Sequence, residues 1–245
     1  MPNLAELVNN KSNQAPVEPV LSTRPLTGKE RHPLILLSGG YKVGKSWAIA
    51  AASADPRVAR VRVIEVGRDA GAMDEYGAIP GAKVELIDHD GTWTGVSGQI
   101  QAACAAPRPE HQGYNILAID GATSLWALLS RTAQNGGRDI GPGGWAALNQ
   151  TWDDMLDVLR THDGPVVLTA RVDGDGLVGD DIGKVRTQKD LPYDVDVVVQ
   201  ASGHREFNLR GVRSVRFKDL PGVIEIGDLN LPELLDMLTG DSARP

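Results

Sequence analysis

Short apolar runs alternate with helical patterns along most of the chain. Residues 34–37 (LILL) are continuously apolar and lead into Gly39-Gly40, and residues 46–54 then show a helical pattern that Pro56 ends. Further apolar runs span residues 61–66, 84–87, 116–119, 166–169 and 195–199. Continuously apolar strands that alternate with helices are typical of a parallel sheet covered on both faces, so the pattern predicts an α/β fold.

Helical spacing predicts three more helices and a different tail. The helices span residues 96–106, 122–133 and 145–162, and Leu148, Trp152 and Leu159 share one face of the last. In the tail, short apolar segments at residues 206–209, 214–217 and 223–226 predict antiparallel strands at a sheet edge. Residues 228–230 then cap a final helix with Pro232 near its first turn.

This pattern divides the chain into three parts. Residues 1–30 are polar and interrupted by prolines, so they are expected to form an arm or linker, either a loose terminus or an arm that docks on a neighbouring subunit. Residues 31–227 form the predicted core with its hairpin extension, and residues 228–245 form the final helix and tail. A chain of 245 residues with 41% hydrophobic content can bury one substantial core.

The composition restricts the classes of partner and the cellular compartment that we expect for this chain. The net charge of −7 excludes a polycation, so nucleic acid would have to bind a local basic surface or the inner face of an oligomer. The single cysteine, Cys104, excludes an internal disulfide and a cysteine-based zinc site. No apolar run approaches the roughly 20 residues of a membrane span. We therefore expect a soluble, cytoplasmic protein that does not enter a membrane.

The strongest chemical signal is a glycine-rich segment between a predicted buried strand and a helix. Residues 39–46 read GGYKVGKS, a full match to GxxxxGK[ST], the Walker A motif. Glycines let backbone N–H groups turn toward phosphate oxygens, and the helix directs its positive end at them. The segment predicts binding of ATP and Mg²⁺ by Gly39, Gly40, Tyr41, Lys42, Val43, Gly44, Lys45 and Ser46.

Within this segment and its expected partner strand the residues have different tasks. Lys45 is expected to reach the β- and γ-phosphates, and Ser46 to give its hydroxyl to Mg²⁺. Tyr41 and Lys42 are left open, since they could serve the nucleobase, a neighbouring subunit or solvent alone. A second magnesium residue is expected at the end of another central strand, where NILAID supplies Asp120, the predicted Walker B residue. The alternative for Asp120 is a helix cap for the segment from residue 122.

The interval between the two motifs indicates the branch of P-loop proteins. Seventy-five positions separate Lys45 from Asp120, and the interval contains the apolar runs 61–66 and 84–87. A strand is therefore expected between the two motif strands in the sheet. This arrangement resembles the RecA and AAA+ branch more than GTPases or small nucleotide kinases, and the sequence contains no NKxD guanine signature.

From residue 116 onward the order of Asp-ended strand, helix, glycine-rich gap, long helix and strand resembles RecA. The overall pattern, over about residues 34–199, is similar to compact RecA-like NTPases of bacteriophages, relatives of RecA and Rad51 associated with recombination and single-strand annealing. The resemblance implies a catalytic glutamate at the end of the strand after the phosphate-loop helix, which is Glu65 in VRVIE. Asp69 remains a competitor, because the residues after Glu65 depart from the RecA text. Thr169 and Arg171 lie where the family carries a γ-phosphate sensor.

The same resemblance implies DNA-binding loops and contacts between subunits. The loops correspond to residues 133–144 and 173–189, and each could also be an ordinary surface loop. Candidates for a basic finger that reaches a neighbour's nucleotide are Lys184, Arg186 and Lys189, with a solvated cationic loop as the alternative. Residues 184–218 contain eight basic and four acidic side chains, a local excess that suits phosphate contacts.

Taken together, the sequence predicts a RecA-like ATPase that is stimulated by single-stranded DNA and assembles as a filament or ring with nucleotide between subunits. Such a protein would act in recombination, annealing or replication in a bacterial host's cytoplasm if a phage encodes it. One alternative is a nucleotide-dependent assembly or regulatory switch that binds a protein partner. Another is a hexameric helicase or packaging motor.

Overall fold

The computed structural model describes residues 21–27, 31–67, 71–110, 112–134, 141–173, 184–219 and 222–240. The chain divides into two units, Met1–Glu30 and Arg31–Pro245. In the first unit only residues 21–27 are described, and they form neither helix nor strand, with Leu21 and Leu26 exposed. The assignment of residues 1–30 as an arm or linker stays a prediction, and all the chemistry predicted above falls in the second unit.

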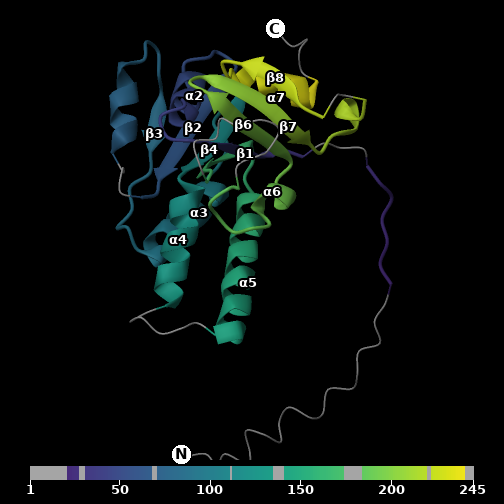
Figure 1. The fold of residues 1–245 in the computed structure, drawn as a ribbon. Coiled ribbons are helices and arrows are strands. Elements are labelled where there is room, and N and C mark those ends of the chain that lie inside the picture. The colour runs from purple at the N-terminus through teal and green to yellow at the C-terminus, as the bar shows by residue number, and fades with distance from the viewer. Residues whose placement is uncertain are drawn as a thin grey trace, which may run out of the picture. The chain divides into compact units, whose positions relative to one another are not determined.

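Among the described residues, the centre of the second unit is one eight-stranded sheet in the order β3-β2-β4-β5-β1-β6-β7-β8 (Figure 1). Neighbouring strands from β3 to β6 pair in parallel, and β7 and β8 are added antiparallel. The predicted α/β class with antiparallel C-terminal strands is confirmed. The strands are β1 (Leu34–Gly39), β2 (Val58–Glu65), β3 (Val84–Leu86), β4 (Tyr114–Asp120), β5 (Val166–Arg171), β6 (Val197–Gly203), β7 (Glu206–Val212) and β8 (Ile224–Gly227).

Helices cover both faces of this sheet. The α-helices are α2 (Lys45–Ala52), α3 (Trp93–Ala105), α4 (Ala122–Ala133), α5 (Gly141–Leu159), α6 (Leu191–Asp194) and α7 (Leu231–Thr239), and the 3₁₀ segments are η1 (Ala72–Ala78) and η2 (Val215–Phe217). In Figure 1, α3, α4 and α5 lie on one side of the strands, and α2 and α7 lie on the other. The layers explain why the inner strands are continuously apolar, since both of their faces are buried.

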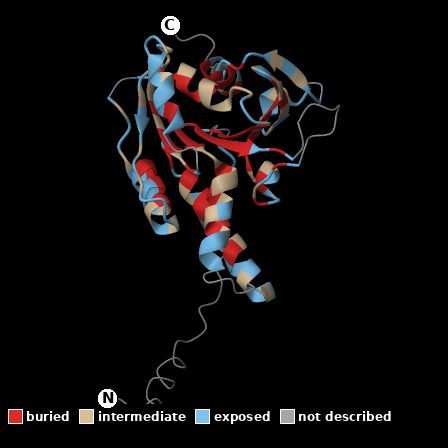
Figure 2. Ribbon diagram, turned by 60° about the vertical axis from the view of Figure 1, so that its left-hand side comes forward, coloured by how far each residue is buried: buried red, intermediate tan, exposed pale blue. Residues whose placement is uncertain are grey.

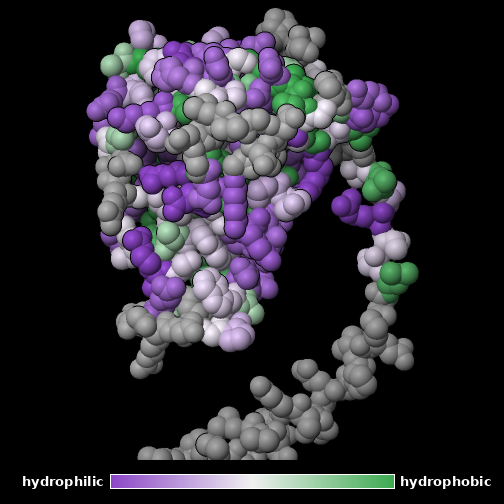
Figure 3. Space-filling view, viewed as in Figure 1, coloured by the Kyte–Doolittle hydropathy of each residue, from purple (hydrophilic) through white to green (hydrophobic). Residues whose placement is uncertain are grey.

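The two faces form two separate apolar cores. Leu36 and Ile119 point into the core that includes Trp152 of α5, whereas Ile35 points into the core that includes Leu235 of α7. Figure 2 shows the buried residues concentrated in the sheet and on the helix sides that face it. Polar side chains dominate the face seen in Figure 3, and its apolar side chains lie in small patches. None of the helices in the described residues is long and apolar enough to cross a membrane.

The expected strand between the two motif strands is present, although it is not one of the strands that precede Asp120. β5 lies between β1 and β4, while β2 and β3 lie beyond β4. The number of residues between the two motifs predicted an intervening strand correctly but pointed to β2 or β3 instead of β5. The length of a sequence interval shows how many strands it can contain, but not where those strands lie in the sheet. β5 follows Asp120 and pairs with both motif strands, through Leu37↔Thr169 and Asp120↔Thr169.

Two of the predicted elements differ from the structure in type or in where they begin. Residues 214–217 were predicted as a strand but contain η2, where the Ser214 side chain accepts a hydrogen bond from Arg216 N and Val215 is 83% exposed. Because this apolar side chain has no sheet to pack on, the local cap determines the structure. Helix α5 begins at Gly141, earlier than predicted, through a glycine-rich stretch whose Pro142 is tolerated in a first helical turn.

Candidate nucleotide-binding site

The loop between β1 and α2 has the backbone geometry of an anion site. Gly44 caps α2 with φ 99°, and a Cβ added there would lie 3.1 Å from Arg205 Cγ, so both conformation and space favour glycine. Lys42 also has a positive φ of 54°. Alternation of left- and right-handed residues turns successive N–H groups toward one concave side, which is how backbone nests hold phosphate.

Lys45 lies inside this loop. Its Nζ donates hydrogen bonds to Gly40 O at 2.5 Å and Gly39 O at 3.2 Å. The pKa of Lys45 is lowered to about 8, chiefly by burial; the Asp120 carboxylate opposes this shift, and the Arg171 charge adds to it. The Lys45 ammonium is partly removed from water, and its charge is only partly compensated by Asp120. Such a cation is suited to binding a polyanion.

The Asp120 carboxylate accepts hydrogen bonds from two hydroxyl groups, one on α2 and one on β5. Ser46 Oγ donates to Asp120 Oδ2 at 2.6 Å, and Thr169 Oγ1 donates to Oδ1 at 2.5 Å. Thr169 Oγ1 in turn accepts Gly121 N at 2.9 Å. Gly121 occupies the N-cap position of α4. The arrangement fixes the carboxylate beside the Ser46 hydroxyl.

The Ser46 hydroxyl and the Asp120 carboxylate suit Mg²⁺ only if a bound ligand supplies further oxygens. Serine hydroxyl and carboxylate oxygens are magnesium ligands, and Mg²⁺ is commonly held by one or two protein groups together with substrate phosphates. In the described part of the chain, no group of three or more His, Cys, Asp or Glu side chains could hold a metal ion. Ser46 and Asp120 would therefore hold Mg²⁺ in partnership with a phosphorylated ligand.

Glu65 lies on the strand next to Asp120, with which it is in register. Its carboxylate accepts backbone N–H groups from Gly71 at 2.7 Å and Met73 at 2.9 Å, and thus caps η1. The competing candidate, Asp69, lies outside the described residues. Tyr76 of η1 is close enough that burial first, and then the charges of Asp120, Glu75 and Glu65, raise the pKa of its hydroxyl. The predicted base is therefore at the site and already accepts two hydrogen bonds.

Arg171 ends β5 in register with Gly39, the last residue of β1. Its backbone N donates to Thr123 Oγ1 at 2.9 Å, and its carbonyl accepts Arg186 N at 2.7 Å. Its side chain is exposed, and its charge acts on Lys45 as described above. Arg171 is consequently beside the phosphate loop, whereas Thr169 is buried and acts on Asp120.

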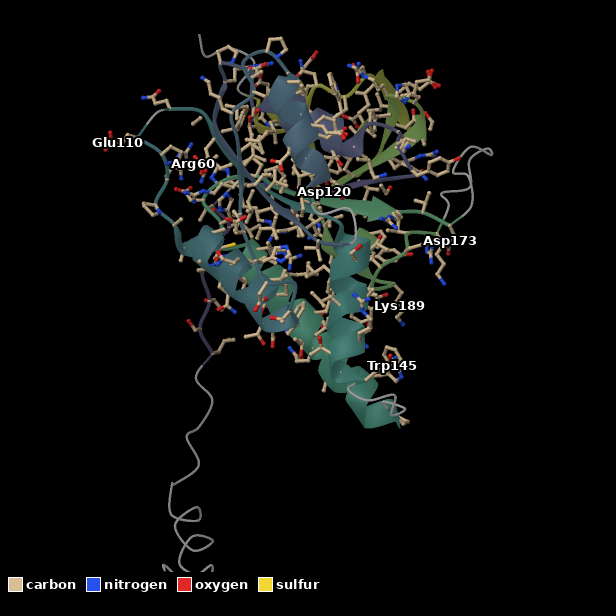
Figure 4. The ribbon with its side chains drawn as sticks, turned by 90° about the vertical axis from the view of Figure 1, so that its left-hand side faces the viewer. Arg60, Glu110, Asp120, Trp145, Asp173 and Lys189 are labelled. Carbon is tan, nitrogen blue, oxygen red and sulfur yellow. The ribbon has the colours of Figure 1, made fainter. Side chains whose placement is uncertain are left out.

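The remaining predicted residues are peripheral or only partly described. Tyr41 is 83% exposed, and Val43 packs on the core that contains α2. Residues 135–140 and 174–183, the centres of the two predicted DNA-binding loops, lie outside the described residues. Arg186 pairs with Asp173 at 3.2 Å. Figure 4 shows Asp120 at the strand ends, with Asp173 and Lys189 toward the periphery.

Sequence reasoning missed a group of side chains next to the loop. Trp47, directly after Ser46, meets the Tyr76 ring edge-on at 6.0 Å, and the Arg205 guanidinium lies 4.9 Å from its ring centre. Trp47, Arg205 and Asp228 also line a cavity of about 180 Å³ alongside α2. No local pattern could reveal this group, because the parts come from segments far apart in the sequence.

The order of the strands agrees with the fold class that the sequence predicts. A parallel sheet in which β5 separates the strand of the glycine loop from the strand that ends in Asp120 has the RecA-like P-loop NTPase fold. No protein-family model matches the sequence, and no curated protein does.

Two solved structures are similar to this chain at low sequence identity. One is a prototypical ATPase from the type III secretion system of pathogenic bacteria, with 13% identity and a TM-score of 0.45 over 78% of this chain and 55% of that one. The other is a DnaB-like replicative helicase, with 12% identity and a TM-score of 0.45 over 80% of this chain and 56% of that one. The chain thus spans little more than half the length of either. The likeness concerns the fold alone.

Proposed function

We propose that the chain binds ATP with Mg²⁺ at residues 39–46 and hydrolyses it. The observation that supports this most is the contact of Ser46 with Asp120, beside a Lys45 ammonium buried in a loop of phosphate-binding geometry. When bound, Mg²⁺ supplies positive charge to the β- and γ-phosphates. Lys45 adds a second cation, and Thr169 keeps the Asp120 carboxylate in place.

Two further residues would act on the γ-phosphate. Glu65 would orient and deprotonate the attacking water, because a carboxylate has about four acceptor positions and two of these hold backbone amides. Arg171 would stabilise the charge that develops on the phosphoryl oxygens from its place beside Gly39.

The test is phosphate release from Mg²⁺-ATP by the full chain, together with calorimetric binding of Mg²⁺-ADP. We expect Lys45→Ala to weaken nucleotide binding by roughly a hundredfold or more. The substitution removes a charge-assisted hydrogen bond and leaves no ammonium to neutralise the phosphates. Lys83→Ala, at an exposed lysine before β3, is the matched control and should bind as the wild type does. A wild type without heat of binding at millimolar nucleotide would falsify the proposal.

We also propose single-stranded DNA as the partner, in recombination, annealing or replication of the phage type. The support is the basic excess of residues 184–218 and an exposed aromatic side chain, Trp145, the fifth residue of α5. An exposed indole can stack on a base, and basic side chains can make electrostatic contacts with the phosphate backbone. Trp145, at 42% exposure, directly follows the first predicted loop.

ATPase rate against DNA type and salt distinguishes this proposal from its rivals. Stimulation by single-stranded DNA that declines steeply with salt is expected. Equal turnover with and without DNA, combined with ATP-dependent self-association, would instead favour the assembly or regulatory switch. Strand displacement by a defined ring, seen by mass measurement with ATP, would favour the helicase or packaging motor.

A further inference from the structure

The turn between β6 and β7 lies against the outside of the phosphate loop. Arg205 N donates to Val43 O at 2.9 Å, and His204 Nδ1 lies 3.2 Å from Lys42 O. Because a carbonyl can only accept, the imidazole is the donor in the second contact. Two adjacent carbonyls of the loop are therefore held by two adjacent residues of a turn more than 160 positions away in the sequence.

These contacts determine which way the loop peptides face. A trans peptide holds its C=O and N–H in opposite directions. With the carbonyls of Lys42 and Val43 directed at the turn, the N–H groups of Val43 and Gly44 point away from it. Lys42 has a φ of 54°, a conformation that costs free energy in a residue with a side chain. The hydrogen bonds from the turn help to offset that cost.

The Arg205 side chain fixes the turn to two further elements. Its guanidinium lies over the Trp47 ring, one residue beyond Ser46, and its Cγ fills the space beside Gly44. Nε also donates to Asp228 Oδ1 at 3.1 Å, in the segment between β8 and α7. The backbone and the side chain of one residue thus contact the loop, the first turn of α2 and the C-terminal segment.

We propose that the β6–β7 turn sets the peptide orientation of the phosphate loop, with His204 and Arg205 as positioning residues and Asp228 holding Arg205 in place. The inference rests on the proposed nucleotide binding. The N–H groups that the turn directs away from itself are the ones that meet the phosphates. Nucleotide affinity then depends on a turn that does not touch the nucleotide.

The test compares donors at residue 204. Calorimetric titration of the full chain with Mg²⁺-ADP should show about fivefold weaker binding for His204→Ala, the equivalent of one ordinary hydrogen bond. His204→Asn should bind within about twofold of the wild type, because an amide NH₂ can replace the imidazole donor. In steady-state ATP hydrolysis the alanine variant should show a raised KM with little change in kcat, the signature of lost ground-state binding.

A second pair of variants tests the side chain of Arg205 without disturbing the backbone. Arg205 has a φ of 58°, which glycine adopts freely, so Arg205→Gly keeps the N–H to Val43 and removes the guanidinium. Both Arg205→Gly and Asp228→Asn should weaken Mg²⁺-ADP binding several-fold. Glu85→Gln, which removes the charge from an exposed ion pair with Arg62 at the opposite sheet edge, should not.

The outcomes separate the inference from the function on which it rests. Binding by the wild type that stays unchanged in His204→Ala, Arg205→Gly and Asp228→Asn overturns the inference alone. Equal weakening in His204→Ala and His204→Asn also overturns it, since the donor would then be irrelevant. No binding by the wild type overturns both the proposed function and the inference. Thermal unfolding of each variant identifies any loss that comes from misfolding.

Discussion

The ends of β4 and β2 carry two carboxylates side by side, and their surroundings differ. Asp120 on β4 accepts hydrogen bonds from the hydroxyls of Ser46 and Thr169. Glu65 on β2 accepts them from backbone amides of the segment that follows it. A hydroxyl can exchange its carboxylate partner for a metal ion, whereas the Glu65 carboxylate holds two backbone amides at the start of η1. Although both residues end neighbouring strands, the Asp120 carboxylate is suited to metal binding, whereas the Glu65 carboxylate also stabilises the start of η1.

The largest expected effect is at Asp120. Asp120→Asn should reduce ATP hydrolysis by about a thousandfold and remove the magnesium dependence of nucleotide binding, because the amide is a poor ligand for a hard cation. Glu65→Gln provides the contrast and should keep that dependence. Binding of ADP measured with Mg²⁺ and with EDTA checks both. Equal magnesium dependence in the two variants would remove the functional distinction between the strand ends.

Glu65 itself is tested next. Glu65→Gln should lower hydrolysis by about a hundredfold while leaving nucleotide affinity unchanged, as expected for loss of a general base. The amide oxygen of glutamine can still accept a hydrogen bond from the η1 amides, so thermal stability should fall only slightly. A variant with wild-type turnover and a lower melting temperature would show that Glu65 is only the cap of η1.

The titration of Lys45 should appear in nucleotide binding. Since burial lowers the pKa of Lys45 to about 8, its ammonium is present below that pH and is lost as the pH rises through it. Affinity for Mg²⁺-ADP should be highest below pH 7 and about tenfold weaker at pH 9, with proton uptake on binding that grows over the same range. Calorimetry in buffers of different ionisation enthalpy measures that uptake. Arg171→Gln should move the midpoint upward, because a neighbouring positive charge is removed.

The smallest effect is expected at Thr169. Thr169→Val removes the hydroxyl that joins Asp120 to Gly121 N in a buried site, and should cost about 1–3 kcal/mol in the free energy of unfolding. Thr169→Ser keeps the hydroxyl and should cost less. Urea unfolding of both variants provides the comparison. A valine variant as stable as the serine variant would mean that the hydroxyl contributes nothing to the strand end.

The sequence predicted what depends on neighbouring residues. The glycine loop and its Lys45 and Ser46 form one continuous motif, and the alternation of apolar runs with helices was enough for the α/β class. Asp120 and Thr169 could be placed because each stands at or near the end of a buried strand, and parallel strands end at one edge of the sheet. The catalytic and binding roles assigned to these residues stay predictions.

What the sequence could not provide depends on distant partners. The contact of the Glu65 carboxylate with the backbone amides of Gly71 and Met73 has no local sequence signature. The contact of Arg205 with Trp47 joins segments that only the sheet order brings together. Residues 214–217 have the composition of a strand, but they have no surface to pack on. Because strand propensity reflects packing more than backbone preference, this segment does not form a strand. Arg205 itself counted only toward the basic excess.

The position of the β6–β7 turn has a consequence for synthesis of the chain. During synthesis, residues 39–46 leave the ribosome more than 150 residues before His204, Arg205 and the leucines of α7 that cover α2. Domains acquire their native contacts as the necessary segments become available. A nascent chain therefore has its glycine loop without this outer support until residues 204–238 have been synthesised, and under the proposed function nucleotide would stabilise the loop only after that point.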